Sequence, residues 1–219
     1  MQELFSAIRR NALGLAIFAA LTAGAIAVTQ VLTQQRINDN MAAAQAKALY
    51  QLVPASEVDN DLLHDTLDLH GPAAAKQFHL NLLGPIKDDA VAYLARKNGQ
   101  IHTVILPITA PDGYTQEIRL LVGIRADGSL SGVRVVEHKE TPGLGDKIEL
   151  KKSPWLLGFS DKSLLNPEIE HWKVKKDGGD FDQFTGATIT PRAVVLAVRR
   201  SLEFFDKHKD ALLNAKAAE

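Results

Sequence analysis

A long apolar run and then an amphipathic segment open the chain. Ala12–Leu32 is a run of 21 residues, and no charge occurs anywhere from Asn11 to Gln35. As a helix with a rise of 1.5 Å per residue, the run spans about 31 Å, close to the hydrocarbon thickness of a bilayer, about 30 Å. Arg36–Val53 places apolar residues three or four apart and stops at Pro54. The pattern predicts a membrane helix that continues outward as a helical stalk.

In the middle of the chain, apolar and polar residues alternate with a period of two. A dipeptide typical of tight turns separates the two segments of each expected strand pair. The paired segments are Val91–Arg96 with Ile101–Leu106 around Asn98-Gly99, and Ile118–Ile124 with Val133–Val135 around Asp127-Gly128. Asn-Gly and Asp-Gly between alternating apolar runs are strong hairpin signals. We therefore expect at least four antiparallel strands between Val91 and Glu137.

The last third returns to loops and one helix. Glu140–Gly145 is a Pro- and Gly-containing loop, Trp155–Asn166 is expected as helix or turn, and Lys173–Thr185 as loop with one short strand at most. Thr190 as N-cap and Pro191 as first helical residue would start the final helix. Its apolar stripe contains Val195, Val198, Leu202 and Phe205. The fold class predicted is α+β, a mostly antiparallel sheet flanked by helices and preceded by one N-terminal transmembrane helix.

The charges beside the apolar run set its expected orientation. Arg9 and Arg10 precede it, so the positive-inside rule places the N-terminus in the cytoplasm and the body across the membrane. The expected division is residues 1–35 as cytoplasmic N-terminus and anchor, 36–58 as stalk, and 59–219 as extracytoplasmic domain. Two alternatives stay open: a signal peptide cleaved near Ala25-Ile26-Ala27, and a buried helix of a soluble protein.

Composition removes several function classes. The chain has no Cys, which excludes thiolate catalysis, disulfides, iron–sulfur ligation and thiolate zinc sites. A formal net charge of -1 argues against a mainly nucleic-acid partner. The seven His residues show no ligand spacing, and His138 beside Glu137 and Glu140 is the best metal candidate, with an ordinary surface histidine as the simpler interpretation.

The segment Asp182–Thr190 carries the clearest chemistry. Three hydroxyls, of Thr185, Thr188 and Thr190, surround Gly186, whose missing side chain lets the backbone approach a ligand. The start of the expected helix adds free N–H groups and a positive dipole end, a combination that favours phosphate. A Thr-rich capped turn without a ligand is the plain alternative. Lys173, Lys175 and Lys176 just before the motif could attract a phosphate or form a solvated basic face.

Asp182-Gln183-Phe184-Thr185-Gly186-Ala187-Thr188 matches the flavinylation motif D-x-x-[S/T]-G-A-T in full. The chain resembles the family of G subunits of the Rnf (Rsx) electron transport complexes, relatives of the C subunit of the sodium-pumping NADH:quinone reductase. The resemblance covers nearly the whole chain. It is carried by the N-terminal anchor and by the stretches Ala110–Tyr114, His138–Glu149 and Trp172–Ala193.

The resemblance implies a role for each matching residue. Thr188 would carry FMN through a phosphoester bond, and Thr185, Gly186 and Ala187 would shape the turn that presents it. Asp182 would serve recognition by a separate, magnesium-dependent flavin transferase. The loop residues that would form the wall against the isoalloxazine ring are Thr141, Gly143, Leu144 and Gly145.

The same resemblance implies the cellular role. The chain would be a membrane-anchored redox subunit of a ferredoxin- and NAD-linked, ion-translocating oxidoreductase, carrying electrons on FMN and having no independent active site. Its partners would be other membrane subunits of that complex, and it would lie in a bacterial inner membrane with its main domain in the periplasm.

Other functions have weaker support. An anchored binding or scaffold module without a redox cofactor is the main alternative. A phosphoester hydrolase would need clustered carboxylates or His for metals, which the sequence lacks. Gly143-Leu144-Gly145 begins like a dinucleotide fingerprint but lacks its third Gly and a βαβ unit. Trp155 and Trp172 could stack on a flavin, although core packing is the default for tryptophan.

Overall fold

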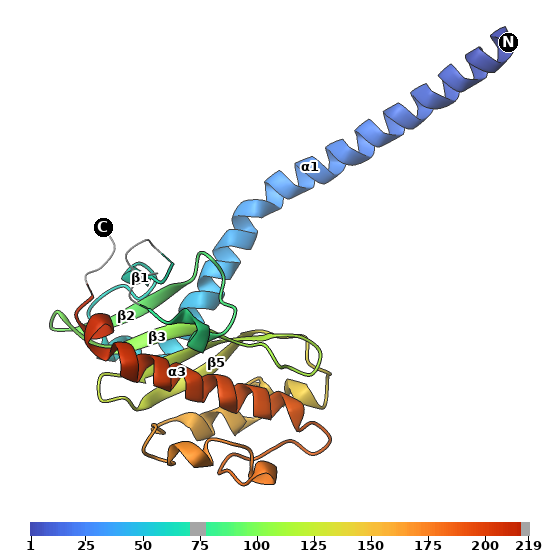
Figure 1. Ribbon diagram of the computed structural model, residues 1–219. Helices are drawn as coiled ribbons and strands as arrows, with labels where there is room; N and C mark the ends of the chain where they lie inside the picture. The colour runs from blue at the N-terminus through green and yellow to red at the C-terminus, as the bar shows by residue number, and fades with distance from the viewer. Residues whose placement is uncertain (71–77, 216–219) are drawn as a thin grey trace. The chain divides into compact units, whose positions relative to one another are not determined.

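The computed structural model describes residues 1–70 and 78–215 (Figure 1). The predicted 59–219 domain therefore includes two stretches, 71–77 and 216–219, that lie outside the described residues. The chain forms two compact units, Met1–Gln45 and Ala46–Glu219. Each unit is described by itself below.

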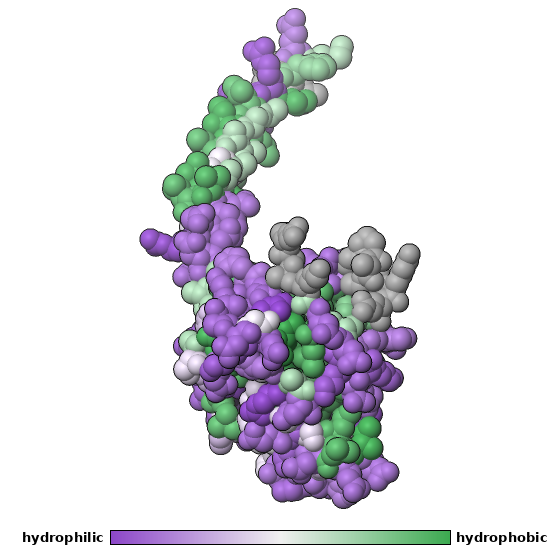
Figure 2. Space-filling model, turned by 90° about the vertical axis from the view of Figure 1, so that its left-hand side faces the viewer, coloured by the Kyte–Doolittle hydropathy of each residue, from purple (hydrophilic) through white to green (hydrophobic). Residues whose placement is uncertain are grey.

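The first unit is helical. Helix α1 runs without interruption over Gln2–Leu52, so the helix expected for Arg36–Val53 is confirmed up to Leu52. Residues 8–45 are all exposed, and Figure 2 shows the apolar part of α1 as a band between hydrophilic ends. Within the described residues, the one stretch long and apolar enough to cross a membrane is Ile8–Leu52. Such exposure suits a lipid-facing helix and not the buried helix of a soluble core.

The second unit is built on a five-stranded antiparallel sheet in the order β1-β2-β3-β4-β5. The strands are β1 (Thr66–Asp68), β2 (Val91–Lys97), β3 (Gln100–Ala110), β4 (Ile118–Arg125) and β5 (Leu130–Glu137). The four strands expected between Val91 and Glu137 are confirmed, and β1 adds a short edge strand. Each of these strands pairs in antiparallel orientation with the strand that precedes or follows it in the chain.

Both predicted turn dipeptides connect strands. Asn98 and Gly99 join β2 to β3. Their φ angles are 54° and 76°, and a two-residue type I′ hairpin turn requires positive φ at both of its central residues. Between β4 and β5, Gly128 has φ of 91° and the Asp127 carboxylate accepts a hydrogen bond from the Ser129 amide at 2.8 Å. These turns set the pairing register of the strands that they join.

The sheet is covered on both faces, so successive residues of a strand pack into two different cores. Val104, Leu106 and Ile108 of β3 belong to the main core, which contains the buried residues of helix α3, Ile189–Leu213. In Figure 1 this helix runs across the sheet. Ile105, between Val104 and Leu106, belongs to a second core that includes Leu49, Leu52 and Val53, from the end of α1 and just beyond it. The last turns of α1 are thus part of the folded body.

The helices between β5 and α3 are all short 3-10 helices, and the strands there are reduced to isolated bridges. Together with two earlier ones, these helices are η1 (Ala55–Glu57), η2 (Leu80–Leu83), η3 (Gly145–Ile148), η4 (Pro154–Phe159), η5 (Ile169–His171) and η6 (Lys175–Asp177). The short strand allowed for Lys173–Thr185 is absent: among the described residues this segment takes part in two isolated bridges, Val174 to Phe181 and Phe184 to Ala187. Five aromatic residues pack in place of regular structure, and we call them the aromatic cluster: Trp155, Phe159, Trp172, Phe181 and Phe184.

Helix α3 buries the stripe that the sequence predicts. Val195, Val198, Leu202 and Phe205 are at most 2% exposed. Further along, His208 is also buried, and its ring stacks on His79 with the centroids 5.2 Å apart. Its Nε2 lies 3.2 Å from both Nδ1 and the amide N of His79.

The buried His208 makes stability depend on pH. Burial first, and then the charges of His79 and Lys207, lower the pKa of His208 below its usual value of 6.5. As pH falls through that value, the unfolded chain takes up the proton before the folded chain does, so the free energy of unfolding falls. We expect a lower Tm at pH 5 than at pH 7.5, and a smaller difference in His208→Phe. An equal pH difference in that variant would contradict the assignment.

Candidate functional site

The motif segment forms a tight turn held by a buried aromatic ring. The Phe184 side chain is 6% exposed and packs edge-on against Trp155, with ring centroids 5.0 Å apart. The Ala187 amide donates back to the Phe184 carbonyl at 3.1 Å, so Thr185 and Gly186 occupy the centre of the turn. Gly186 has φ of 81°, which favours glycine, and a Cβ there would lie 3.3 Å from Leu144 Cδ2.

Thr188 is the residue that precedes helix α3. It occupies the N-cap position with helical backbone angles, φ -87° and ψ -29°, and its side chain makes no capping hydrogen bond. The expected N-cap at Thr190 is wrong: Thr190 lies inside the first turn, is fully buried, and donates its hydroxyl to the Glu140 carboxylate. The Thr190 hydroxyl is therefore bonded to a carboxylate 50 positions earlier in the chain and does not cap the helix.

The loop after β5 approaches the same place. The Thr141 carbonyl accepts hydrogen bonds from the amides of Leu144 and Gly145 at 3.1 Å, which closes the loop on itself. Gly143 supports this turn with φ of 77°. Gly145 is buried, and a Cβ there would meet Thr190 Oγ1 at 2.8 Å and Glu140 Oε2 at 2.9 Å. Only a residue without a side chain lets the loop pack this close to the start of α3.

These segments enclose a cavity of about 240 Å³ beside Thr188. Its lining consists of Tyr114, Glu140, Thr141, Leu144, Gly145, Gly186, Ala187, Thr188, Ile189 and Thr190. Six residues predicted for the site therefore meet: Thr141, Leu144, Gly145, Gly186, Ala187 and Thr188. Tyr114, Leu144 and Ile189 are 66%, 41% and 43% exposed, so they give the cavity an apolar rim open to solvent.

Three predicted site residues are not in the lining. Gly143 and Thr185 are exposed residues of the two turns, and their effect on the cavity is through backbone shape. Asp182 is an exposed residue whose carboxylate lies 2.6 Å from Lys175 Nζ. The Asp182 carbonyl accepts the Trp155 indole N–H at 2.8 Å, so the motif's first residue is fixed while its side chain faces solvent.

Four lining residues were not among those assigned to the flavin site: Tyr114, Glu140, Ile189 and Thr190. The sequence holds a partial signal for all four, because each lies in a segment that carries the family resemblance, and the Thr190 hydroxyl was considered for phosphate binding. Nothing in the local pattern joins Tyr114 and Glu140 to the motif. Their convergence depends on the lengths of β4 and β5, which bring the 111–116 loop and the 138–145 loop to one end of the sheet.

An ion pair fixes the first turn of α3 from outside the cavity. Arg192 donates two hydrogen bonds to Asp177, from Nε at 2.6 Å and from Nη2 at 2.8 Å. These hydrogen bonds lower the pKa of Asp177, and the nearby charges of Lys176 and Lys173 act in the same direction. The pair connects η6 to α3, so the Lys-rich segment is held against the helix that begins at the cavity.

The start of helix α3 has two features that favour binding of a phosphate group. The first amides of α3 have no intrahelical partner, and the helix dipole places partial positive charge there. Among the described residues, no group of three His, Asp or Glu side chains could hold a metal ion. Both ring nitrogens of His138 have hydrogen-bonding neighbours, Nε2 at 3.2 Å from Glu149 Oε1 and Nδ1 accepting the Glu140 amide at 3.1 Å.

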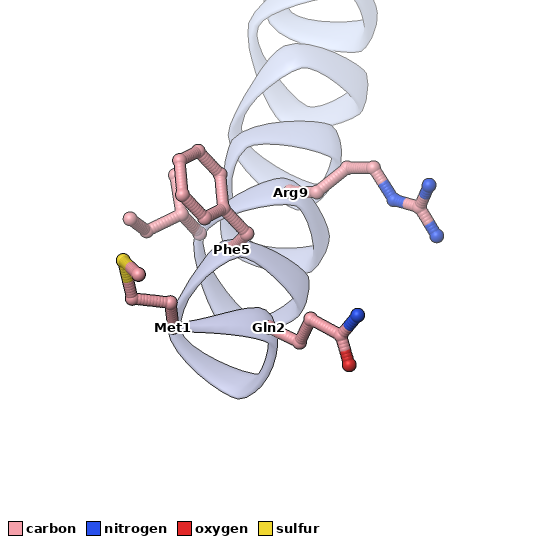
Figure 3. A pocket seen from close by; sticks show the side chains of 5 residues that line it. Met1, Gln2, Phe5 and Arg9 are labelled. Carbon is pink, nitrogen blue, oxygen red and sulfur yellow. The ribbon is translucent and has the colours of Figure 1, made fainter.

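A second hollow lies beside the first turns of α1 (Figure 3). It is lined by Met1, Gln2, Phe5, Ile8 and Arg9, all exposed residues of one helix. The side chains of Met1 and Phe5 project on one side of the helix, and those of Gln2 and Arg9 on the other (Figure 3). Because one helix supplies all its walls, this hollow is a gap between side chains and carries no functional assignment.

Gly145→Ala tests how closely the two walls of the cavity approach. The new Cβ would lie within 3.0 Å of two buried, hydrogen-bonded side-chain atoms, an overpacking that costs about 1–3 kcal/mol. We expect a lower Tm by thermal circular dichroism. Gly158→Ala is the matched control, because a Cβ at this exposed glycine meets nothing within 4 Å. Equal Tm values for the two variants would contradict the close approach.

Comparison with known proteins identifies relatives that match most of the chain. A family model described as FMN-binding domain matches residues 113–203, and one described as RnfG N-terminal region matches residues 1–52. The G subunit of the ion-translocating oxidoreductase complex of Pseudomonas aeruginosa UCBPP-PA14 is 49% identical over 209 residues, 95% of this chain and 94% of the relative. The protein of the same name from Vibrio vulnificus YJ016 is 45% identical over 212 residues, covering 96% and 95%.

One solved structure is similar to part of the chain. It is the C subunit of the Na⁺-translocating NADH-quinone reductase from Parabacteroides distasonis, 20% identical in sequence with a TM-score of 0.40. The match covers 58% of this chain and 64% of the other.

Proposed function

The chain belongs to the family of G subunits of ion-translocating oxidoreductase complexes, and on that premise we propose that it carries electrons on an FMN joined to Thr188 by a phosphoester bond. It is a membrane-anchored redox subunit of such a complex. The observation that carries the proposal is the position of Thr188. Thr188 lines the cavity at the start of α3, and its side chain makes no capping hydrogen bond.

The cavity fits the phosphate end of FMN. A phosphoryl group on Thr188 Oγ1 would lie at the N-terminus of a 25-residue helix, where partial positive charge and unpaired amides stabilise an anion. Gly186 lets the backbone of the motif turn come close, and a side chain at Gly145 would fill the space between the walls. The residues that would hold the group are therefore Thr188, Ile189 and Thr190 with the turn before them.

The cavity would hold only part of the flavin. Its volume, about 240 Å³, is below the range of about 300–1,000 Å³ typical of pockets that enclose a ligand. The exposed side chains of Tyr114, Leu144 and Ile189 would contact the ring system at the rim and leave one edge in solvent. An exposed edge suits a carrier that must exchange electrons with a partner protein.

The residues present determine which roles the protein can fill and which the cofactor must supply. FMN supplies two-electron storage and one-electron transfer, which no side chain of this chain can provide. The protein binds the phosphate end, orients the ring against the 140–145 loop and keeps the cofactor bound through a covalent bond. The bond keeps the cofactor at the site at high effective concentration even where free FMN is dilute.

We also propose the maturation route and the orientation. A separate flavin transferase would attach the FMN, since a threonine hydroxyl is a weak nucleophile without a base or metal. Asp182, exposed and paired only with Lys175 among the described ion pairs, is available for recognition by that enzyme. Arg9 and Arg10 before the apolar run support a cytoplasmic N-terminus and a periplasmic body. The division proposed is residues 1–35 as anchor, 36–58 as a stalk whose last helical turns pack into the body, and 59–219 as flavin domain.

The test is the intact mass of the full chain, purified in detergent from cells that co-express a flavin transferase. We expect a gain of one FMN less one water, located by peptide mapping on the fragment that contains Thr188. A colourless protein of unmodified mass would favour the alternative of an anchored scaffold module without a redox cofactor.

A further inference from the structure

A buried carboxylate lines the cavity, and the proposed function gives it no role. Glu140 is 4% exposed and lines the cavity next to Thr188 and Thr190. Its Oε1 accepts the Thr115 amide at 3.0 Å, and its Oε2 accepts the Thr190 hydroxyl. One side chain thus connects the loop that carries Tyr114, the 140–145 loop and the first turn of α3.

Glu140 places a buried carboxylate in the lining of the cavity without a basic partner. Within residues 1–70 and 78–215, Glu140 forms no ion pair. Its carboxylate accepts from two neutral donors, an amide and a hydroxyl. A buried carboxylate held only by neutral donors is costly, because desolvation is not offset by an opposite charge. Glutamine would keep one acceptor, for the Thr115 amide, but its amide nitrogen would donate to the Thr190 oxygen, so the direction of the second hydrogen bond would reverse. A carboxylate is therefore the side chain that accepts from both donors, and it brings its charge into the lining of the cavity.

We propose that Glu140 is the positioning residue of the flavin site and that its charge lowers the reduction potential of the bound flavin. This inference rests on the proposed function. Its hydrogen bonds hold Tyr114 and the helix start that bears Thr188 in one arrangement. Its charge opposes reduction, because at pH 8 the ring takes up two electrons and one proton and so gains one net negative charge. In a partly buried site such a charge acts with little screening.

Two substitutions separate position from charge. Glu140→Gln keeps an acceptor for the Thr115 amide and a donor for the Thr190 hydroxyl but removes the charge. We expect wild-type FMN content by intact mass and a midpoint potential shifted to more positive values in a dithionite titration at pH 8. Glu137→Gln is the control: this carboxylate is exposed and pairs with Arg119 at 2.8 Å, so its loss should leave the potential where it is in the wild type.

Glu140→Ala removes both hydrogen bonds. In the Thr188→Ala background, which carries no covalent flavin, we expect faster amide hydrogen exchange at Thr115 and in the first turn of α3 than in the Thr188→Ala parent. Glu140→Gln in the same background should exchange as slowly as that parent. This readout does not depend on the cofactor, so it separates failure of the inference from failure of the proposed function.

Either of two results would overturn the inference. An unchanged midpoint potential in Glu140→Gln would show that the charge does not act on the ring. Unchanged amide exchange in Glu140→Ala would show that the carboxylate does not hold the two segments. A wild-type protein without FMN would instead refute the proposed function, while the exchange experiment would still decide the positioning role.

Discussion

Replacing Thr188 with alanine is expected to remove covalent FMN completely. The phosphoester needs an oxygen on this side chain, and alanine supplies none. Neither neighbouring hydroxyl can substitute: Thr185 is exposed in the turn and outside the cavity lining, and Thr190 is buried and bonded to Glu140. After co-expression with a flavin transferase, the variant should show no flavin fluorescence on a denaturing gel and no mass gain.

The loss should be chemical and not a consequence of unfolding. Thr188 makes no capping hydrogen bond and is only half-buried, so alanine there should change the free energy of unfolding by no more than about 0.5 kcal/mol. Circular dichroism and the Tm should therefore match the wild type. Thr188→Ser is the matched control, since it keeps a hydroxyl and should retain attachment. Fluorescence that survives in Thr188→Ala would place the flavin on another residue.

The sheet could be predicted because its signals are local. Alternation along Ile118–Ile124 and the dipeptides Asn98-Gly99 and Asp127-Gly128 each act within a few residues, and each sits where the pattern places it. The second core was not predictable in the same way. Leu49 and Leu52 follow a helix pattern that suits a free stalk, and only the folded sheet supplies the apolar face that buries them.

The site could be predicted in part, and the limit is set by how far apart in the sequence its contacting residues lie. The motif turn and the 140–145 loop are each visible in the sequence, and they meet at one cavity. The N-cap prediction for Thr190 failed because the competing acceptor, Glu140, is remote in sequence. Tyr114 was outside the predicted set for the same reason: hairpin geometry brings its loop to the cavity.

Replacing Trp172 with alanine is expected to give the largest loss of stability. Trp172 is 1% exposed, its indole N–H points to the carbonyls of Ser163 and Pro167 at 3.0 and 3.1 Å, and its ring lies 4.9 Å from that of Phe181. Truncating a buried aromatic residue costs about 3–5 kcal/mol. For a body of this size the Tm should fall by about 6–20 °C.

The same substitution should reduce flavin attachment without touching the cavity. Phe181 directly precedes Asp182, and Phe184 of the aromatic cluster anchors the turn that presents Thr188. With the aromatic cluster loosened, the motif should populate conformations in which Thr188 no longer faces the cavity. The fraction flavinylated should therefore fall along with the Tm.

Leu165→Ala provides the control for the Trp172 substitution. Leu165 belongs to the same irregular segment but is 88% exposed, so its truncation should change stability by no more than about 0.5 kcal/mol and leave flavinylation unchanged. Thermal circular dichroism and intact mass on the two variants, prepared in parallel in detergent, make the comparison. Full flavinylation of Trp172→Ala despite a lowered Tm would mean that the motif turn holds its shape without the aromatic cluster. In that case the short-range contacts of Gly186 and Ala187, and not packing behind the turn, would determine how Thr188 is presented.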